Sequence, residues 1–225
     1  MHKITVGLLF SSLMLMLPAV NAIDVGEITS IMHPGEHIHA KEITNTNNTA
    51  RYIQLNVVRI SSPLPGGVEI PMESKGELLS TPASLVLPGQ AKDVFRLIYK
   101  GPEDNKERYY RLQWLDEPLA DNSRNTASKY GVATTSAEIG TILVVAPRKE
   151  NFKYSFKNGS VTNEGNTSFR IIAHGECLKK MEDQDSCRER YYVMPGMSKK
   201  LNYVNLSSAK SHVGIWRGKT FISIK

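Results

Sequence analysis

Apolar and polar residues alternate with a period of two along several stretches of the chain. The clearest alternation lies at 53–57, with looser runs at 94–99 and 109–115, and residues 139–145 are almost continuously apolar. Alternation predicts a strand with one buried face, and a continuous apolar run predicts a strand buried on both faces. No stretch of helical length shows a convincing period of 3.6 residues, so the pattern predicts an all-β protein.

Proline and glycine separate these predicted strands. Turn-forming pairs or clusters occur at 63–67, 88–89, 101–102 and 195–196. Proline presets the backbone for a turn and cannot donate to a sheet ladder, and glycine adopts turn conformations without strain, so these residues end strands. Short strands with frequent turns are typical of β-sandwiches.

A weak internal repeat predicts two similar domains in tandem. Residues 44–53 resemble 162–171, each a polar turn that leads into a strand, and 87–92 resemble 194–199, each a Pro-Gly turn that leads into a strand. Because the two devices recur in the same order, we favour duplication over chance similarity between turns.

The predicted junction lies at 147–151, where a proline and charged residues follow the most apolar strand. Domain boundaries usually fall in such polar linkers. We therefore expect a first domain at 23–147 and a second, smaller domain at 152–225.

The first 22 residues have the pattern of a secretory signal peptide. Lys3 precedes an apolar run at 6–17, and Val20-Asn21-Ala22 resembles a signal-peptidase site. The alternative is a membrane anchor, but the apolar run is too short to span about 30 Å of hydrocarbon. We expect cleavage after Ala22, export, and no membrane insertion.

Charge and motifs argue against several function classes. The chain has 28 basic and 22 acidic side chains, a net charge of +6, and cleavage would remove Lys3 and no acid, which leaves +5. Along the sequence the basic residues are mixed with acids, whereas nucleic-acid binding favours an acid-free stripe. G-x-S-x-G, P-loop and H-E-x-x-H motifs do not occur. We expect no enzymatic activity, no cofactor and no nucleic acid partner.

The cysteines predict a disulfide. Cys177 and Cys187 lie ten residues apart, and in an oxidising compartment they would close a short loop. His37 and His39 would share a strand face and could ligate a metal ion, but no further ligand accompanies them, so no metal site is expected. Trp114 and Trp216 lie among strand residues and are expected to pack in cores.

Four sequence runs together resemble the periplasmic chaperones that assemble pili. They are the Pro-containing turn at 79–91, the Arg-Leu strand at 94–97, Glu107-Arg108-Tyr109-Tyr110-Arg111-Leu112, and the apolar strand with its following Pro-Arg at 139–148. The similarity spans nearly the whole chain after residue 22. The pattern resembles the alternate chaperone–usher group, and within it the chaperones of the common pilus.

The resemblance implies two immunoglobulin-like β-sandwich domains in a boomerang arrangement. It also implies a periplasmic chaperone that caps incomplete pilus subunits, both pilins and tip adhesins, by lending them a strand of its first domain. An outer-membrane usher would then receive the complex. A free chaperone could cover the same strand edge in a homodimer.

The resemblance places the lent strand at about 130–145, preceded by a polar loop at 121–129. Successive side chains of a strand point to opposite faces, which leaves two candidate binding faces. The alternative face is Val132, Thr134 and Ser136. The face that we favour ends in a large apolar residue and avoids Glu138, and it consists of Ala133, Thr135, Ala137 and Ile139.

The sequence departs from the related chaperones at the carboxylate anchor. In those proteins an Arg of the first strand and a Lys of the last strand of the first domain hold the C-terminal carboxylate of the client. The matching positions are Thr29 or Ser30 and Thr141 or Ile142, and none of them is basic.

Other residues must supply the anchor if there is one. A guanidinium binds a carboxylate through two parallel hydrogen bonds, so Arg111 is the preferred candidate. Arg96 and Arg148 are further candidates, with a hydroxyl from Thr141, although Arg96 could instead pair with an acid between the domains.

The rival hypothesis is a pilin-like or adhesin subunit of the fimbria itself. Such a subunit carries an N-terminal extension of alternating apolar residues, and residues 23–32 alternate to some degree. The tandem repeat and the predicted hinge favour the chaperone.

Overall fold

The computed structural model describes residues 23–119, 136–181, 184–218 and 220–225. The predicted signal peptide, the polar loop at 121–129, and Ala133 and Thr135 of the favoured face lie outside these residues. Within them every regular element is a strand. The strands are β1 (Ile23–Asp24), β2 (Thr29–Met32), β3 (Ile38–Asn45), β4 (Arg51–Ile60), β5 (Leu78–Thr81), β6 (Ser84–Leu87), β7 (Lys92–Tyr99), β8 (Arg108–Pro118), β9 (Ala137–Val145), β10 (Tyr154–Lys157), β11 (Ser160–Asn163), β12 (Phe169–Met181), β13 (Gln184–Val193), β14 (Ser198–Lys200), β15 (His212–Arg217) and β16 (Thr220–Ser223).

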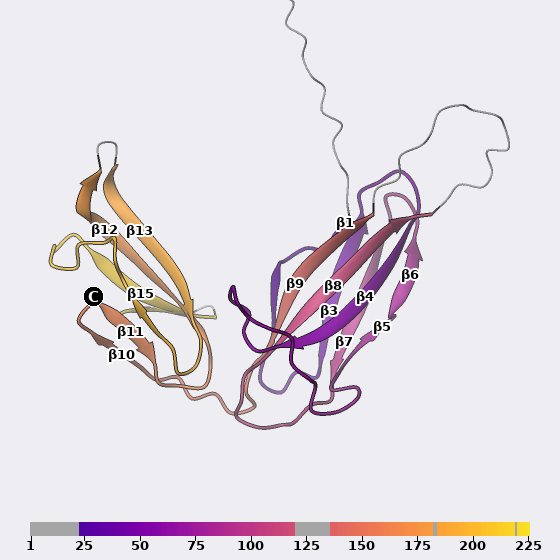
Figure 1. The fold of residues 1–225 in the computed structure, drawn as a ribbon, viewed down its shortest axis with the longest axis horizontal. Helices are drawn as coiled ribbons and strands as arrows, with labels where there is room; N and C mark the ends of the chain where they lie inside the picture. The colour runs from indigo at the N-terminus through magenta and orange to yellow at the C-terminus, as the bar shows by residue number, and fades with distance from the viewer. Residues whose placement is uncertain (1–22, 120–135, 182–183, 219) are drawn as a thin grey trace, which may run out of the picture.

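The strands form two sandwiches that meet at an angle (Figure 1). In the first domain a four-stranded sheet in the order β1-β3-β7-β5 faces a five-stranded sheet in the order β2-β9-β8-β4-β6. In the second domain a three-stranded sheet, β10-β11-β14, faces a four-stranded sheet, β13-β12-β15-β16. The predicted all-β fold and its boomerang shape are confirmed, and no sheet is shared between the domains.

Each domain has its own apolar core. The first is built around Trp114, whose ring meets that of Phe95 edge to face at 5.1 Å between centroids. The second is smaller and centres on Phe169, Ile171 and Ile215. The predicted disulfide joins Cys177 of β12 to Cys187 of β13 and lies at the edge of this second core.

The internal repeat corresponds to a shared buried hydrogen-bonding device. Asn45 and Asn163 are each fully buried at the end of a strand. The Asn45 amide donates to the carbonyls of Thr49 and Leu87, and the Asn163 amide donates to those of Thr167 and Val193. Each asparagine thus ties a polar turn to the strand end before the Pro-Gly turn, which explains why the two turns recur together.

One core prediction is wrong. Trp216 is half-buried on the outer face of its sheet, where its ring lies 5.2 Å from that of Phe221. Periodicity within β15 places its neighbours Val213 and Ile215 in the core instead. No helix long and apolar enough to cross a membrane occurs within the described residues.

Candidate functional site: the open edge of strand β9

Strand β9 has a partner along the whole of one edge and along only part of the other. On one side it pairs with β8 in antiparallel register from Asp116↔Ala137 to Arg108↔Val145. On the other side β2 runs parallel to it and covers only 142–145. Among the described residues, the outer edge of β9 from 137 to 141 therefore has no partner strand.

The backbone groups that face this open edge follow from the last bond of the covered part. The Ile142 N–H donates to the Ile28 carbonyl at 2.7 Å, so the backbone of Ile142 faces β2. Backbone direction alternates along a strand, so Gly140 and Glu138 also face away from β8. Their N–H and C=O groups point toward the open edge, ready to pair with a further strand.

The side chains of β9 divide into a core face and an outer face. Leu143 and Val145 are buried in the first core, Ile139 packs partly against it, and Ala137 is half-buried. The core face is thus less covered toward the start of the strand, where β9 is farthest from the second domain (Figure 1). On the opposite face Glu138 is exposed.

One buried polar contact holds β9 in register beside β8, and a second holds β8 against β4. The Trp114 indole N–H donates to the Thr141 hydroxyl at 3.0 Å, and both residues are fully buried. At the far end, Asp116 pairs with Arg51 at 2.5 Å between Oδ1 and Nε. Leaving a buried polar group unpaired is costly, so these contacts fix how β9, β8 and β4 lie beside one another in the sheet.

Lys41 sets the point at which β2 begins, and sequence analysis missed it. This lysine of β3 is buried, and its ammonium donates to the Glu27 carbonyl at 2.5 Å and to the Ser30 hydroxyl at 3.4 Å. Burial lowers the pKa of Lys41, and Glu27 partly opposes this shift. A lysine at an inward position of an alternating strand is the signal that could have revealed it.

The two positions that align with the carboxylate anchor of related chaperones come together, but without charge. Thr29 of β2 is the register partner of Ile142 of β9. Ser30 and Thr141, the alternative alignments, are both buried. The Thr141 hydroxyl is occupied by Trp114, so it faces the core and not a cleft.

The structure does not bring the three arginine candidates for the anchor together. Arg111 lies on the outer face of β8, beside Ile142 of β9 and Val58 of β4. Arg96 is exposed on β7, in the other sheet of the sandwich. No ion pair of Arg111 or Arg96 is found among the described residues. Arg148 is already engaged, since its guanidinium donates to the Glu36 carbonyl at 2.8 Å.

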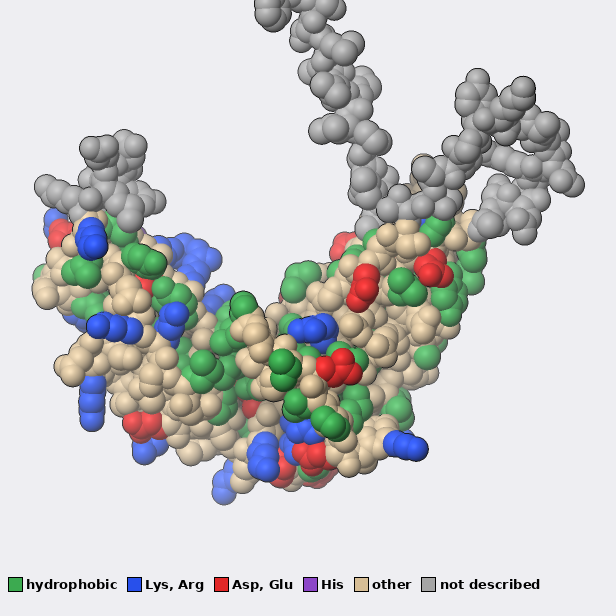
Figure 2. All heavy atoms as spheres, viewed as in Figure 1, with side chains coloured by type: hydrophobic (Ala, Val, Ile, Leu, Met, Phe, Trp, Pro, Cys, Tyr) green, Lys and Arg blue, Asp and Glu red, His purple; other side chains and the backbone are tan. Residues whose placement is uncertain are grey.

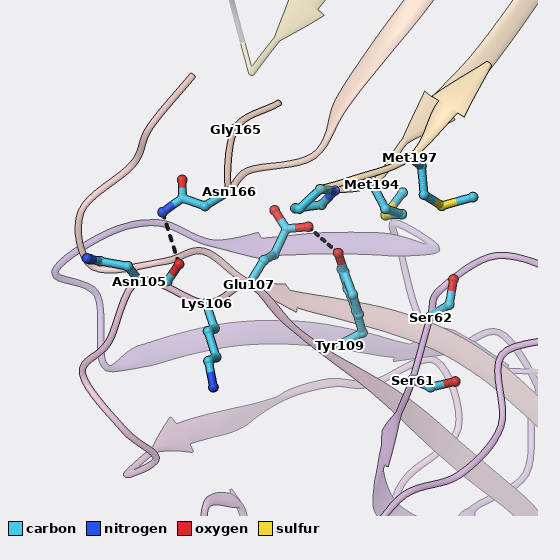
Figure 3. A pocket seen from close by; sticks show the side chains of 11 residues that line it. Ser61, Ser62, Asn105, Lys106, Glu107, Tyr109, Gly165, Asn166, Met194 and Met197 are labelled. Carbon is cyan, nitrogen blue, oxygen red and sulfur yellow. Dashed lines mark hydrogen bonds between the residues drawn. The ribbon is translucent and has the colours of Figure 1, made fainter. Parts of the chain in front are cut away.

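The outer face of β8 leads into a pocket between the domains. Figure 2 shows a hollow there with hydrophobic side chains on its walls. A pocket of about 440 Å³ is lined by Tyr109, two residues before Arg111 on the same face, and by Met194 and Met197 of the second domain (Figure 3). Arg111 therefore lies on the face that looks toward the second domain.

A half-buried carboxylate links the two domains at this seam. Glu107 accepts hydrogen bonds from the Ser168 N–H at 2.8 Å and hydroxyl at 3.1 Å, and from the Tyr109 hydroxyl at 2.6 Å. Burial raises the pKa of Glu107, and these three donors oppose the rise. Asn166 adds a second link by donating to the Asn105 carbonyl at 2.9 Å (Figure 3).

The described residues contain no group of three or more His, Cys, Asp or Glu side chains that could hold a metal ion. His37 lies within 3.6 Å of the Glu103 carboxylate and within 3.3 Å of the Arg148 guanidinium. His39 is half-buried on β3, and burial lowers its pKa.

Several solved structures of chaperones share this fold. The crystal structure of the class 5 fimbriae chaperone CfaA matches with a TM-score of 0.57 and 17% identity, covering 90% of this chain and 97% of that one. The periplasmic chaperone SfaE matches with a TM-score of 0.56 and 13% identity, covering 90% and 98%. A complex of the Salmonella enterica SafA pilin with the SafB chaperone also matches, with a TM-score of 0.52, 15% identity, and coverage of 87% and 90%. The fold is therefore that of the two-domain fimbrial chaperones.

Curated relatives then identify the family. The chain is 47% identical to the probable fimbrial chaperone EcpB of Klebsiella pneumoniae subsp. pneumoniae, over 100% of this chain and 99% of the relative. It is 46% identical, with the same coverage, to the protein of that name from Escherichia coli strain K12. The model of the EcpB C-terminal domain matches residues 152–224. The chain belongs to the EcpB family of fimbrial chaperones, and a pilin-like or adhesin subunit is not favoured.

Proposed function

We propose that this chaperone lends the open edge of β9 to a fimbrial subunit and catalyses nothing. The observation that carries the proposal is the missing partner strand beside 137–141, since a subunit that lacks one strand needs such an edge. Main-chain hydrogen bonds to Gly140 and Glu138 would supply the docking. The lent strand would extend the sheet β2-β9-β8-β4-β6 into the subunit.

The favoured binding face is Ala133, Thr135, Ala137 and Ile139. Ala137 and Ile139 lie on the core face of β9, at the end where coverage by the domain's own core diminishes. A subunit core placed there would continue the chaperone's own core. Ile139 already touches the first core, so its side chain would lie where the two cores meet.

For the client's C-terminal carboxylate we propose Arg111, alone among the four anchor candidates. It lies on the sheet face that looks toward the interdomain hollow and has no ion pair among the described residues. Thr141 is committed to Trp114, and Arg96 lies on the other sheet. A matched pair of variants tests this: Arg111→Ala should weaken client binding, and Arg96→Ala should not.

We place the mature protein in the periplasm, with residues 1–22 removed, a first domain at 23–147 and a second at 152–225. Its clients would be pilin and tip-adhesin subunits, and an outer-membrane usher would accept the complex. N-terminal sequencing of the periplasmic protein should begin at Ile23.

Co-expression with a candidate fimbrial subunit tests the proposal. We expect a soluble one-to-one complex in the periplasm, and aggregation or degradation of the subunit without the chaperone. A chain that polymerised with itself instead would overturn the proposal. Sedimentation of the free protein would show whether a homodimer covers the β9 edge in the absence of client.

A further inference from the structure

Charge is divided unevenly between the domains. Residues 152–225 contain 13 Lys and Arg but 6 Asp and Glu, whereas 23–147 contain 12 and 15. The second domain thus has a net charge of +7 (13 − 6) and the first of −3 (12 − 15). In the sequence of the second domain, basic residues are mixed with acids. Only the folded sheet can show whether the basic side chains cluster on one face.

Strand register places three arginines on one face of the sheet β13-β12-β15-β16. Arg188 and Arg190 of β13 lie two residues apart and point the same way, and their partners on β12 are His174 and Ile172. Arg170 of β12 lies on the same face, two residues before Ile172 and opposite Tyr192 of β13. Arg188 and Arg190 are exposed, and Arg170 is half-buried with no hydrogen-bond partner at its Nε.

Acids do not neutralise this face in the part of the chain that is described. Glu176 lies beyond Arg188 on the same face, and its carboxylate already pairs with Lys210 at 3.5 Å. Glu189, between the two exposed arginines, points inward and accepts hydrogen bonds from the backbone of 202–204. The three arginines make no ion pair with any described acid.

An aromatic row borders the arginines. Tyr192, Trp216 and Phe221 share the face with Arg170, which lies between Tyr192 and Trp216 in the register. Tyr192 and Phe221 are each 52% exposed. The Phe221 ring lies over Gly214 so closely that a Cβ there would approach the ring to 2.2 Å. The absence of a side chain at Gly214 therefore lets the Phe221 ring lie this close to the sheet.

We propose that this outer face of the second domain binds an extended acidic segment of a partner protein. Arg188 and Arg190 are about 7 Å apart along the strand, which matches alternate side chains of an extended peptide. Guanidinium groups bind carboxylates through two hydrogen bonds, and flat aromatic rings pack against the apolar parts of such a segment.

The spacing of the arginines favours an acidic peptide over an anionic lipid surface. A lipid surface requires only positive charge, whereas two in-line arginines with an aromatic row define a direction and a repeat. The face belongs to a different domain and sheet from the β9 edge, so the inference does not depend on strand donation. A client on β9 would leave the arginine face free for a second partner.

Peptide binding to the full mature chain tests the proposal. The probes are a ten-residue peptide of alternating Glu and Thr and a block peptide of the same composition. Trp216 reports binding by fluorescence, because the other tryptophan, Trp114, is fully buried. The alternating peptide should bind about fivefold or more tightly than the block peptide. The double variant Arg188→Glu/Arg190→Glu should weaken binding of the alternating peptide by about tenfold or more, because the charges are reversed.

The matched control is Lys157→Glu/Lys200→Glu, which makes the same charge change on the other sheet of the domain, where both side chains are exposed. It should change affinity by no more than about twofold. Equal binding of the two peptides, no binding, or equal losses in both variants would overturn the proposal. So would arginine-dependent binding to phosphatidylglycerol vesicles without peptide binding, or a homodimer broken by Arg188→Glu/Arg190→Glu.

Discussion

The Ile142 N–H donates a 2.7 Å hydrogen bond to the Ile28 carbonyl, and this bond marks the end of the covered edge of β9. The chain that precedes β2 does not continue along β9, because β1 pairs with β3 in the opposite sheet. A single N-terminal segment therefore contributes to both sheets. The length of the open edge is set by where this segment changes sheet.

Gly140→Pro should block the open edge without unfolding the protein. The Gly140 N–H points away from β8, so proline removes no bond of the β8–β9 ladder, and a Cβ at this position meets no atom within 4 Å. We expect client affinity to fall by about tenfold, the value of one lost backbone hydrogen bond. Gly140→Ala, which keeps the N–H, is the control and should bind normally in a pull-down. Equal binding by both variants would count against edge pairing.

The face that binds the client can be decided by charge. Ala137→Asp, made together with Thr135→Asp, should abolish the complex, because carboxylates would enter an apolar groove. Glu138→Lys changes the opposite face and should leave the complex intact. Yield of the co-purified subunit is the measurement, and thermal unfolding of the free proteins checks the fold. The reverse pattern would assign binding to the other face.

Asp116→Asn should destabilise the first domain by about 3–5 kcal/mol, because it leaves the Arg51 guanidinium buried without its carboxylate. Asp116 is fully buried and Arg51 is 6% exposed. Urea unfolding measures the loss. The double variant Arg51→Met/Asp116→Leu should be less destabilised than Asp116→Asn, since it removes both charges. A small loss in Asp116→Asn would contradict the structural role of the pair.

Acid should weaken the hinge end of the first domain through Asp104. The Arg108 guanidinium, 2.6 Å away, holds the pKa of Asp104 at about 2, below its ordinary value of 3.8. A carboxylate with a lowered pKa in the folded state stabilises above its ordinary pKa, and this contribution is lost as the pH falls from 3.8 toward 2. Unfolding measured between pH 5 and pH 2 should therefore be less pH-dependent in Asp104→Asn than in the unmodified protein. Identical pH profiles would contradict the assignment.

Reduction of the Cys177–Cys187 disulfide should destabilise the second domain by about 2–3 kcal/mol, the loop-closure value for a loop of this length. Urea unfolding of the Cys177→Ser/Cys187→Ser variant measures it. The strands on either side are already paired, from Phe169↔Val193 to Glu176↔Ser186, so the domain should remain folded. Complete unfolding of this variant would show that the small second core cannot fold without the disulfide.

Much of the fold could be predicted from the spacing of apolar residues and from the turn-forming residues. The alternating runs at 53–57, 94–99 and 109–115 lie within β4, β7 and β8, and the apolar run at 139–145 lies within β9. The repeated polar turns predicted the duplication, although the sequence does not show that Asn45 and Asn163 are the buried residues that make it work. Trp216 was misplaced because an aromatic residue in a strand fits either face.

Long-range pairing limited the prediction of the candidate site. Composition marks β9 as apolar but cannot say that β2 covers only 142–145 or that Thr141 is used by Trp114. Side-chain chemistry suggests which residues could anchor the carboxylate, but the sheet faces on which they lie depend on strand order. The arginine face of the second domain was hidden for the same reason, because Glu189 separates Arg188 and Arg190 in sequence but points to the opposite side.

Amide hydrogen exchange of the chaperone with and without a client subunit tests strand donation most directly. The amides of Glu138 and Gly140 should exchange quickly in the free protein and become protected in the complex, whereas those of Ile139 and Thr141, which face β8, should be protected in both. A stable complex in which Glu138 and Gly140 still exchange quickly would show that the client binds elsewhere.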